Sequence, residues 1–370
     1  MEIVEINNIG VGYGIVDNNK VFVEKSAVGD IVKDGLIVKK SSRRQEVLCP
    51  YYERCGGCNL LHLSDEEYSN FKKRLCKDAD IIKIGYNARR RVVFNYKDGK
   101  LGFFEKSTNT ITEINNCLML EPQINEILPK LKMLKAKVAV NLYDNGLGIL
   151  LYLEQEPNAK LLNKFLDENA NVIVLSYSIK NAEPFLYLQR KKPVIIFDNI
   201  EVEVSHNIFL QATKGGQNAI TKIVVENLKK CKNVLDLYCG VGTYTFPLSN
   251  YTKIHSIEGM EEMVKILKNN IGTKKISCEI RDLVNRPLVY DELNKYDGIV
   301  INPPRNGAGK QCFYIAKSKI KKIVMVSCNP QTFFQDINVL VSAGYKLKQT
   351  TGIDQFYGTN HLEIVGVLEK

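Results

Sequence analysis

The chain has 370 residues, 45% of them hydrophobic and 25% charged, with a formal net charge of +10. These values predict a globular protein of two or three domains with enough apolar material for sizeable cores. They argue against a membrane protein, because no apolar run approaches the roughly 18 residues that span a bilayer, and the N-terminus "MEIVEINNIG" lacks signal-peptide features. We therefore expect a monomeric cytoplasmic protein with no membrane contact, and the excess positive charge favours a polyanionic partner.

Residues 1–46 predict a short antiparallel β-module. Apolar positions alternate with a period of two and are interrupted by glycine and Asn-Asn turns, as in "VGYGIVDNNKVFVEK". A compact β-barrel is the small fold that such strands form.

A cysteine-rich loop follows this module. Ten cysteines in a cytoplasmic chain are not expected to form a disulfide framework, so they are thiols, metal ligands or catalysts. Cys49, Cys55 and Cys58 have the spacing C-x5-C-G-G-C, and Cys117 follows in "INNCLML". Four thiolates can hold zinc or an iron–sulfur cluster, and the spacing does not choose between them. The alternative is four unrelated free thiols.

Residues 47–205 predict a central domain of the α+β class. Segments such as "AKVAVNLYD" and "GILLYLE" are typical of strands and "EPQINEILPKLKML" is typical of a helix, a mixture that favours a mostly antiparallel sheet. The run Arg89-Arg90-Arg91 leads directly into the strand-like "VVFNY". It is a candidate phosphate-binding site, with an ordinary solvated face as the alternative.

Residues 206–370 change to a strand–helix alternation, which predicts an α/β domain with a doubly wound, Rossmann-like parallel sheet. The ligand of such a sheet is expected beyond the carboxyl ends of its strands. Candidate chemistry should therefore be sought where predicted strands end.

The first of these strand ends, in "VLDLYCGVGTYTFPL", resembles a nucleoside-binding turn. Gly240 and Gly242 allow close approach of the backbone, and Tyr238 offers an aromatic surface. Glu258, in "SIEG", can accept both ribose hydroxyls, and Asp282 follows the third strand. The phosphate fingerprint G-x-G-x-x-G is absent, so a cofactor without phosphate, S-adenosylmethionine, fits better. A glycine turn kept for geometry alone is the alternative.

Two later strand ends carry a thiol and a proline loop. "IVMVSCNP" ends on Cys328, and a thiolate that adds to carbon-6 of uracil makes carbon-5 able to attack a methyl sulfonium. A base must then remove the carbon-5 proton, and Glu363 in "HLEIVG" is the candidate, with His361 as a candidate to orient it. Taken alone, Cys328 could be a core thiol and Glu363 a surface carboxylate. In "NPPR", Arg305 replaces the aromatic residue that follows Asn-Pro-Pro in amino-group methyltransferases.

At this point the sequence resembles a known family over nearly its whole length. The elements "FLQ", "DLYCGVG", "SIEG", "NPPR", "SCNP" and "HLE", in this order, are similar to the RNA uridine-5-methyltransferases of the TrmA/RumA type. The resemblance implies that Cys328 is the nucleophile and Glu363 the base. It also implies cofactor contacts from six residues: Gln211, Tyr238, Gly240, Glu258, Asp282 and Asn302.

The same resemblance implies a [4Fe–4S] cluster on Cys49, Cys55, Cys58 and Cys117, and an RNA-binding TRAM-like barrel that is truncated here. Asn302 departs from the family, which usually has aspartate there, and an amide cannot carry charge or take a proton. Relatives with both barrel and cluster act on large-subunit RNA, so 23S rRNA is expected rather than tRNA. The alternatives are a tRNA uridine methyltransferase, an amino-group methyltransferase, or an RNA-binding protein with weakened catalysis.

Overall fold

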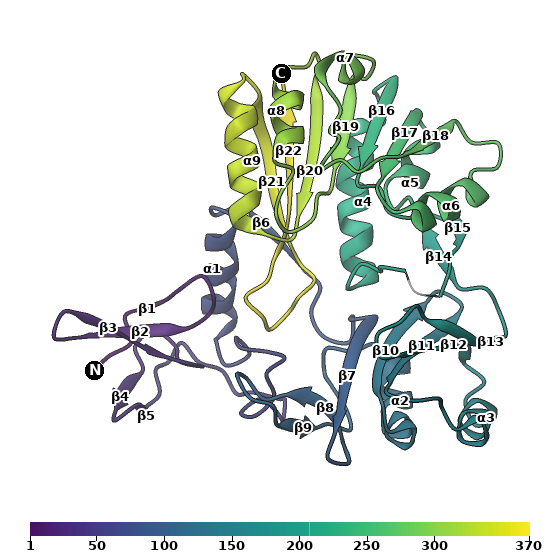
Figure 1. The fold of residues 1–370 in the computed structure, drawn as a ribbon. Helices are drawn as coiled ribbons and strands as arrows, with labels where there is room; N and C mark the ends of the chain where they lie inside the picture. Colours follow the sequence, from purple (N-terminus) through teal and green to yellow (C-terminus); the bar gives the residue numbers. More distant parts are fainter. Residues whose placement is uncertain (207) are drawn as a thin grey trace.

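The computed structural model describes residues 1–206 and 208–370, and it confirms an α/β methyltransferase fold with further small sheets (Figure 1). A β-module lies at one side, a central sheet lies below, and the C-terminal sheet lies above with its helices. No helix in the described parts of the chain is long and apolar enough to cross a membrane.

The N-terminal module consists of two small antiparallel sheets. One is the meander β1 (Glu5–Ile6), β2 (Gly12–Val16) and β3 (Asn19–Val23), and the other is the hairpin β4 (Ile31–Lys33) and β5 (Leu36–Lys39). A bridge between Glu2 and Ile31 joins them. The β2–β3 turn has two residues with positive φ, Asp17 and Asn18, as a tight two-residue hairpin requires.

The central domain is built on a seven-stranded sheet in the order β13-β12-β11-β10-β7-β8-β9, in which only β11 and β12 are parallel neighbours. Helices α2 (Pro122–Leu131) and α3 (Ala159–Asp167) bury their apolar residues in the same core as this sheet, and the short helix η1 (Lys132–Leu134) continues α2. The strands are β7 (Arg91–Lys97), β8 (Lys100–Phe104), β9 (Ile111–Glu113), β10 (Lys137–Tyr143), β11 (Gly146–Leu153), β12 (Val172–Ile179) and β13 (Phe185–Gln189).

The C-terminal domain is built on an eight-stranded sheet in the order β18-β17-β16-β19-β20-β22-β21-β6. Its first five strands are parallel: β16 (Asn233–Leu237), β17 (Lys253–Glu258), β18 (Ile276–Ile280), β19 (Gly298–Ile301) and β20 (Lys322–Ser327). The last strand, β22 (Glu363–Glu369), is antiparallel to both β20 and β21 (Lys346–Asp354). The helices are α4 (Lys214–Leu228), α5 (Thr245–Ser249), α6 (Glu261–Asn270), α7 (Tyr290–Leu293), α8 (Lys310–Ala316) and α9 (Pro330–Ser342).

Several segments of the expected central domain, residues 47–205, pack with the C-terminal domain instead. Strand β6 (Asp80–Lys83) is the edge strand of the C-terminal sheet, where it pairs in parallel with β21. The hairpin β14 (Val194–Phe197) and β15 (Ile200–Glu203) packs on the same domain, and the ring of Phe197 is stacked on that of Phe246 at 6.4 Å. The chain therefore crosses between the two domains more often than a boundary at residue 205 implies.

Helix α1 (Asp65–Leu75) fixes the N-terminal part of the chain to this sheet. Ser64 caps the helix, because its hydroxyl accepts a hydrogen bond from the backbone N–H of Glu67. From the buried face of α1, Lys72 forms an ion pair of 2.8 Å with Asp354 at the end of β21, and both side chains are fully buried. The loop that follows β21 therefore starts from a fixed point.

Candidate active site

Cys328 and Glu363 face each other across two neighbouring strands. Cys328 directly follows β20, and Glu363 is the first residue of β22. These strands are antiparallel, and their register pairs Ser327 with Ile364. The next residue on each strand is then Cys328 on one and Glu363 on the other. The structure thus brings the two predicted catalytic residues together.

Glu363 is a buried carboxyl group, only 4% exposed. Burial raises its pKa to about 7, and three neighbours oppose this rise: a hydrogen bond from Gln355 and the charges of Arg91 and Arg305. The amide Nε2 of Gln355 donates to Oε2 of Glu363 at 3.0 Å. Gln355, and not the expected His361, is therefore the side chain that orients Glu363 in this structure.

Gln355 is not predictable from its neighbourhood, because "DQF" carries no motif. The only signal that could have located it is the β21–β22 hairpin, whose register pairs Ile353 with Glu363 and so places residue 355 close by. Strand β21 itself was not predicted.

Cys328 is half-buried beside the same charged groups. Burial raises the pKa of its thiol and the charge of Glu363 raises it further, whereas a hydrogen bond from Arg305 and the charge of Arg305 lower it. Burial lowers the pKa of Arg91, and the charges of Glu363 and Cys328 raise it. The guanidinium of Arg91 lies 4.2 Å from the ring centre of the exposed Phe209. Two cations thus stand beside a thiol and a carboxyl group whose charged forms would otherwise repel each other.

The three consecutive arginines serve internal sites and are not an exposed phosphate-binding patch. Arg91 reaches the Cys328–Glu363 pair, as described above. Arg90 is 3% exposed and donates from Nε to the carbonyl oxygen of Gln211 at 3.0 Å and from Nη2 to Oε1 of Gln217 at 2.6 Å. Arg89 lines the cavity that holds the four predicted cysteine ligands.

The glycine turn after β16 and the acid after β17 form one loop system. Tyr238, Gly240 and Gly242 all have positive φ, and a side chain at Gly242 would collide with Phe246 at 2.7 Å. Oε2 of Glu258 accepts the N–H of Gly240 at 3.0 Å, and its Oε1 accepts the N–H groups of Gly259 and Met260. Backbone hydrogen bonds therefore fix the carboxylate, and they leave one lone-pair site, on Oε2, for a ribose hydroxyl.

Asp282 is held by its own turn. Its Oδ1 accepts the backbone N–H of Val284 at 2.9 Å, and its Oδ2 accepts the side-chain amide of Asn285 at 2.6 Å. Hydrogen bonds from Asn285 and from the backbone lower the pKa of this exposed carboxyl group. Burial is the main cause that raises the pKa of Tyr238, and the charges of Asp282 and Glu258 are among the smaller causes.

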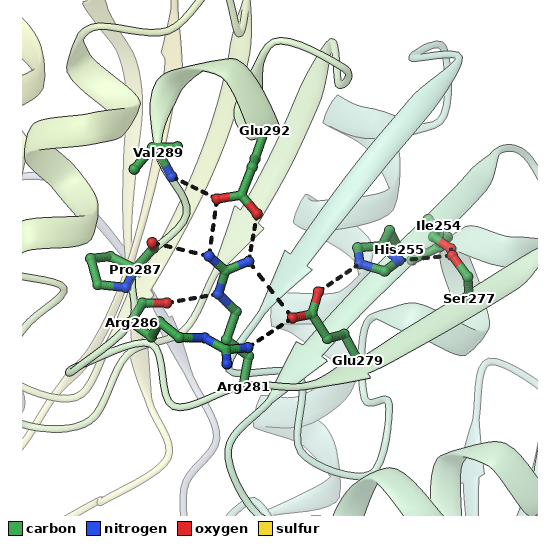
Figure 2. Close-up of polar contacts among 9 residues, drawn as sticks. All are labelled: Ile254, His255, Ser277, Glu279, Arg281, Arg286, Pro287, Val289 and Glu292. Atoms are coloured by element: carbon green, nitrogen blue, oxygen red, sulfur yellow. Dashed lines mark hydrogen bonds and ion pairs between the residues drawn. The ribbon is translucent and has the colours of Figure 1, made fainter.

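A salt-bridge network holds the loop that begins with Asp282 (Figure 2). The guanidinium of Arg281 binds both carboxylate oxygens of Glu292, at 2.7 and 2.9 Å, and donates from Nε to the carbonyl oxygen of Arg286 at 2.7 Å. Glu279 lies between Arg281, Arg286 and His255. This bidentate pairing closes residues 281–292 into a fixed loop beside the candidate cofactor site.

The remaining predicted cofactor residues, Gln211 and Asn302, meet at a buried tyrosine that the sequence analysis missed. Nδ2 of Asn302 lies 3.4 Å from the hydroxyl of Tyr244. Burial and the charge of Glu363 raise the pKa of Tyr244, while hydrogen bonds from Gln211 and Asn302 lower it. Gln211 also accepts a hydrogen bond from Gln355 at 3.1 Å. A polar chain thus runs from Asn302 to Glu363.

The four predicted cluster ligands line one cavity of about 340 Å³, which Arg89, Gln355 and Tyr357 also line. All are free thiols. Burial raises the pKa of Cys58, and the charges of Cys117, Cys55 and Cys49 raise it further. Cys58 therefore interacts electrostatically with the other three thiols. Among the described residues, no three histidine, cysteine, aspartate or glutamate side chains are grouped closely enough to hold a metal ion.

The fold and the loop system around Tyr238 and Glu258 are those of an S-adenosylmethionine-dependent methyltransferase, and comparisons with known proteins specify the family. A family model described as tRNA (Uracil-5-)-methyltransferase matches residues 198–370. An uncharacterized RNA methyltransferase of Brucella suis is 31% identical, covering 99% of this chain and 97% of the relative. The chain therefore belongs to the family of RNA (uracil-5-)-methyltransferases.

Two further relatives name different RNAs. A 23S rRNA (uracil(1939)-C(5))-methyltransferase of Mannheimia succiniciproducens is 28% identical, covering 100% of this chain and 95% of the relative. The crystal structure of a Pyrococcus abyssi tRNA (uracil-54, C5)-methyltransferase with S-adenosyl-L-homocysteine superposes with a TM-score of 0.80 at 19% identity, covering 100% and 99% of the two chains. The latter likeness establishes the shared fold.

Proposed function

We propose that this enzyme methylates carbon-5 of a uridine in 23S rRNA through a covalent intermediate, with Cys328 as nucleophile and Glu363 as base. The observation that carries the proposal is the placement of these two side chains opposite each other on β20 and β22, with Arg91 and Arg305 beside them. A thiol and a carboxyl group in this arrangement can act on the two adjacent carbons of one pyrimidine ring.

The steps follow from these two groups. The Cys328 thiolate adds to carbon-6, and the electron pair of the ring double bond moves into an enolate. Carbon-5 then attacks the methyl group of S-adenosylmethionine, and S-adenosylhomocysteine leaves. Glu363 takes the proton from carbon-5, the double bond re-forms, and the thiolate is expelled from carbon-6. The target uridine has to leave its base stack to reach this site.

A 5-fluorouridine transcript tests the chemistry. Fluorine cannot leave carbon-5 as a proton does, so the proposed reaction stops at a protein–RNA adduct that survives denaturation. We expect such a band with S-adenosylmethionine, and no band with Cys328→Ala. An absent band on an RNA that binds the protein would contradict covalent uridine methylation and favour amino methylation or a binding role.

The choice of 23S rRNA rests on the rRNA enzyme among the relatives and on the cysteine set next to the N-terminal module. Methyl transfer to unmodified total rRNA and to unmodified tRNA, measured side by side, tests it. We expect 5-methyluridine in the large-subunit RNA. Methylation of tRNA alone would assign the enzyme to the alternative substrate.

We further propose that Cys49, Cys55, Cys58 and Cys117 hold a [4Fe–4S] cluster. A zinc ion holds thiolates at about 2.3 Å, so four of them must converge on one point. A [4Fe–4S] cluster binds one thiolate at each iron, and the four thiols here line a single cavity. A bound cluster would tie the loop of residues 49–58 to the segment around Cys117, in a structural role.

Iron and acid-labile sulfide in anaerobically purified protein test this second proposal. We expect about four of each per chain and their loss in Cys58→Ser. Cys278→Ser, a half-buried cysteine outside the cavity, is the matched control and should keep both. Bound zinc without sulfide would replace the cluster by a single-ion site.

A further inference from the structure

We infer that Gln355 is a positioning residue for the proton-abstracting carboxylate of Glu363. This inference rests on the proposed function, because it assigns Gln355 to the second half of that reaction, in which carbon-5 loses its proton. Two observations carry it: the hydrogen bonds of one amide group and the way in which the surrounding loop is held.

The amide nitrogen of Gln355 uses both of its hydrogens. It donates to Oε2 of Glu363 at 3.0 Å and to Oε1 of Gln211 at 3.1 Å. Both partner atoms are oxygens, so the opposite orientation of the amide would set its oxygen against Oε1 of Gln211 and against the ionised carboxylate of Glu363, and both bonds would be lost. Gln355 is 3% exposed, and water does not compete for these contacts. One side chain thus joins the base to a residue predicted to contact the cofactor.

The other side of Gln355 approaches the first turn of helix α4 closely. A side chain at Gly216, in the first turn of α4, would lie 2.8 Å from Oε1 of Gln355, so this glycine makes room for the close approach. The preceding residue, Asp354, accepts a hydrogen bond of 2.7 Å from Tyr68 and is paired with Lys72. The loop that carries Gln355 is therefore held by α1 on one side and by α4 on the other.

These contacts have a chemical consequence for Glu363. A donor to a carboxylate favours its charged form and fixes its direction, whereas burial favours the neutral form, which cannot accept a proton. The other groups that reach Glu363 are Arg91 from β7, Arg305 from the loop after β19, Cys328 from the end of β20 and Tyr244 from the glycine turn. Among the described residues, only Gln355 donates a hydrogen bond to this carboxylate.

Single-turnover kinetics on a uridine transcript with labelled S-adenosylmethionine test the inference. Gln355→Met keeps the length of the side chain without its N–H groups. We expect methylated RNA to enter the covalent adduct normally and to leave it roughly tenfold more slowly, the usual effect of losing a hydrogen bond to a charged group. The acid limb of the release step should move up by about one pH unit, because the pKa of Glu363 rises.

Gln311→Met is the matched control, because Gln311 is a buried glutamine whose amide binds the backbone of Leu288 instead. It should lower the thermal midpoint without changing adduct release or the pH limb. If Gln355→Met folds poorly, Gln355→Asn serves in its place. Its amide is too short to reach Glu363, so we expect the same slow release and the same shift of the pH limb. Release kinetics and a pH limb equal to those of the wild type in either folded Gln355 variant would overturn the inference. Failure of the proposed function is a different result: no adduct with 5-fluorouridine in the wild-type protein and no methylated adduct accumulating in Glu363→Gln.

Discussion

At the scale of single residues, two arginines control the charges of the catalytic pair. Cys328 must be a thiolate to add to carbon-6, yet burial and Glu363 both raise its pKa. Arg305 is the side chain that lowers it, through a hydrogen bond and through its charge, and a backbone hydrogen bond adds to this effect. The thiolate of Cys328 and the carboxylate of Glu363 therefore both depend on the positive charges of Arg91 and Arg305.

Arg305→Leu should slow adduct formation with 5-fluorouridine RNA by roughly tenfold near neutral pH, because a charge-assisted hydrogen bond to the thiolate is lost. The pKa of Cys328 rises in this variant, so raising the pH should restore part of the rate. Arg286→Leu removes an exposed arginine of the nearby salt-bridge network and is the control. A rate loss that is equal at every pH would mean that Arg305 acts on RNA binding and not on the thiol.

The ionisation of Glu363 as the pH rises should increase activity and decrease stability. Its pKa rises from 4.5 to about 7 on folding, so the folded state favours the neutral form. The contribution of Glu363 to stability is then fully present below about pH 4.5 and is lost as the pH rises from 4.5 to about 7, where the buried group ionises. Proton removal from carbon-5 needs the charged form and should fail below about pH 7.

Glu363→Gln separates these two effects. The variant should accumulate methylated adduct at every pH, because the amide cannot take the proton. It should also melt at a higher temperature than the wild type at about pH 8 and show no such gain near pH 4.5. An equal difference in melting temperature at both pH values would mean that Glu363 is not neutral in the folded protein at low pH.

At the scale of elements, the contact between α1 and β21 is the attachment on which the catalytic loop depends. Lys72 is buried, and burial lowers its pKa while Asp354 raises it. Its ammonium also donates to the carbonyl oxygen of His361 at 2.6 Å, and Gly358 donates to the hydroxyl of Tyr68 at 3.0 Å. The loop between β21 and β22 is thus held at its start and near its end by one helix.

Lys72→Met should lower the free energy of unfolding by about 3–5 kcal/mol, because it leaves the Asp354 carboxylate buried without its cation. Denaturant unfolding measures this loss. The double variant Lys72→Met/Asp354→Leu removes both charges and should recover a large part of the stability. If the double variant is as unstable as the sum of the two single variants, the two side chains are not coupled in the folded state.

These elements also mark the limit of what the sequence predicts. Local signals located the glycine turn at Gly240 and the strand that ends at Cys328, because each depends on neighbouring residues. The pairing of β6 with β21 and the contact of Gln355 with Gln211 join residues that are far apart in the chain. No period or capping signal records such contacts. For the same reason the sequence predicts a phosphate-binding site or a solvated face for the arginine run, whereas Arg90 is buried and binds Gln217.

At the scale of the whole molecule, the net charge is +10, and the arginine run is largely internal. Other basic side chains therefore have to contact the phosphates of RNA. The N-terminal module, which projects from the body in Figure 1, carries Lys33, Lys39 and Lys40 on its second sheet or directly after it. All three are exposed, and none has an ion-pair partner among the described residues. Unpaired lysines on a projecting module can neutralise phosphates and release counterions.

The salt dependence of RNA binding tests this assignment. Each phosphate contact contributes about 0.7 to 0.9 to the slope of log affinity against log salt. Lys39→Ser/Lys40→Ser should therefore reduce the slope by roughly 1.4 to 1.8 without a change in thermal midpoint. Arg90→Met should do the reverse: it leaves the slope unchanged and lowers the midpoint, because Arg90 binds Gln211 and Gln217 inside the protein. A reduced slope in Arg90→Met, together with an unchanged slope in the lysine variant, would mean that the arginine run contacts the phosphates. The guanidiniums would then have to leave their internal partners when RNA binds.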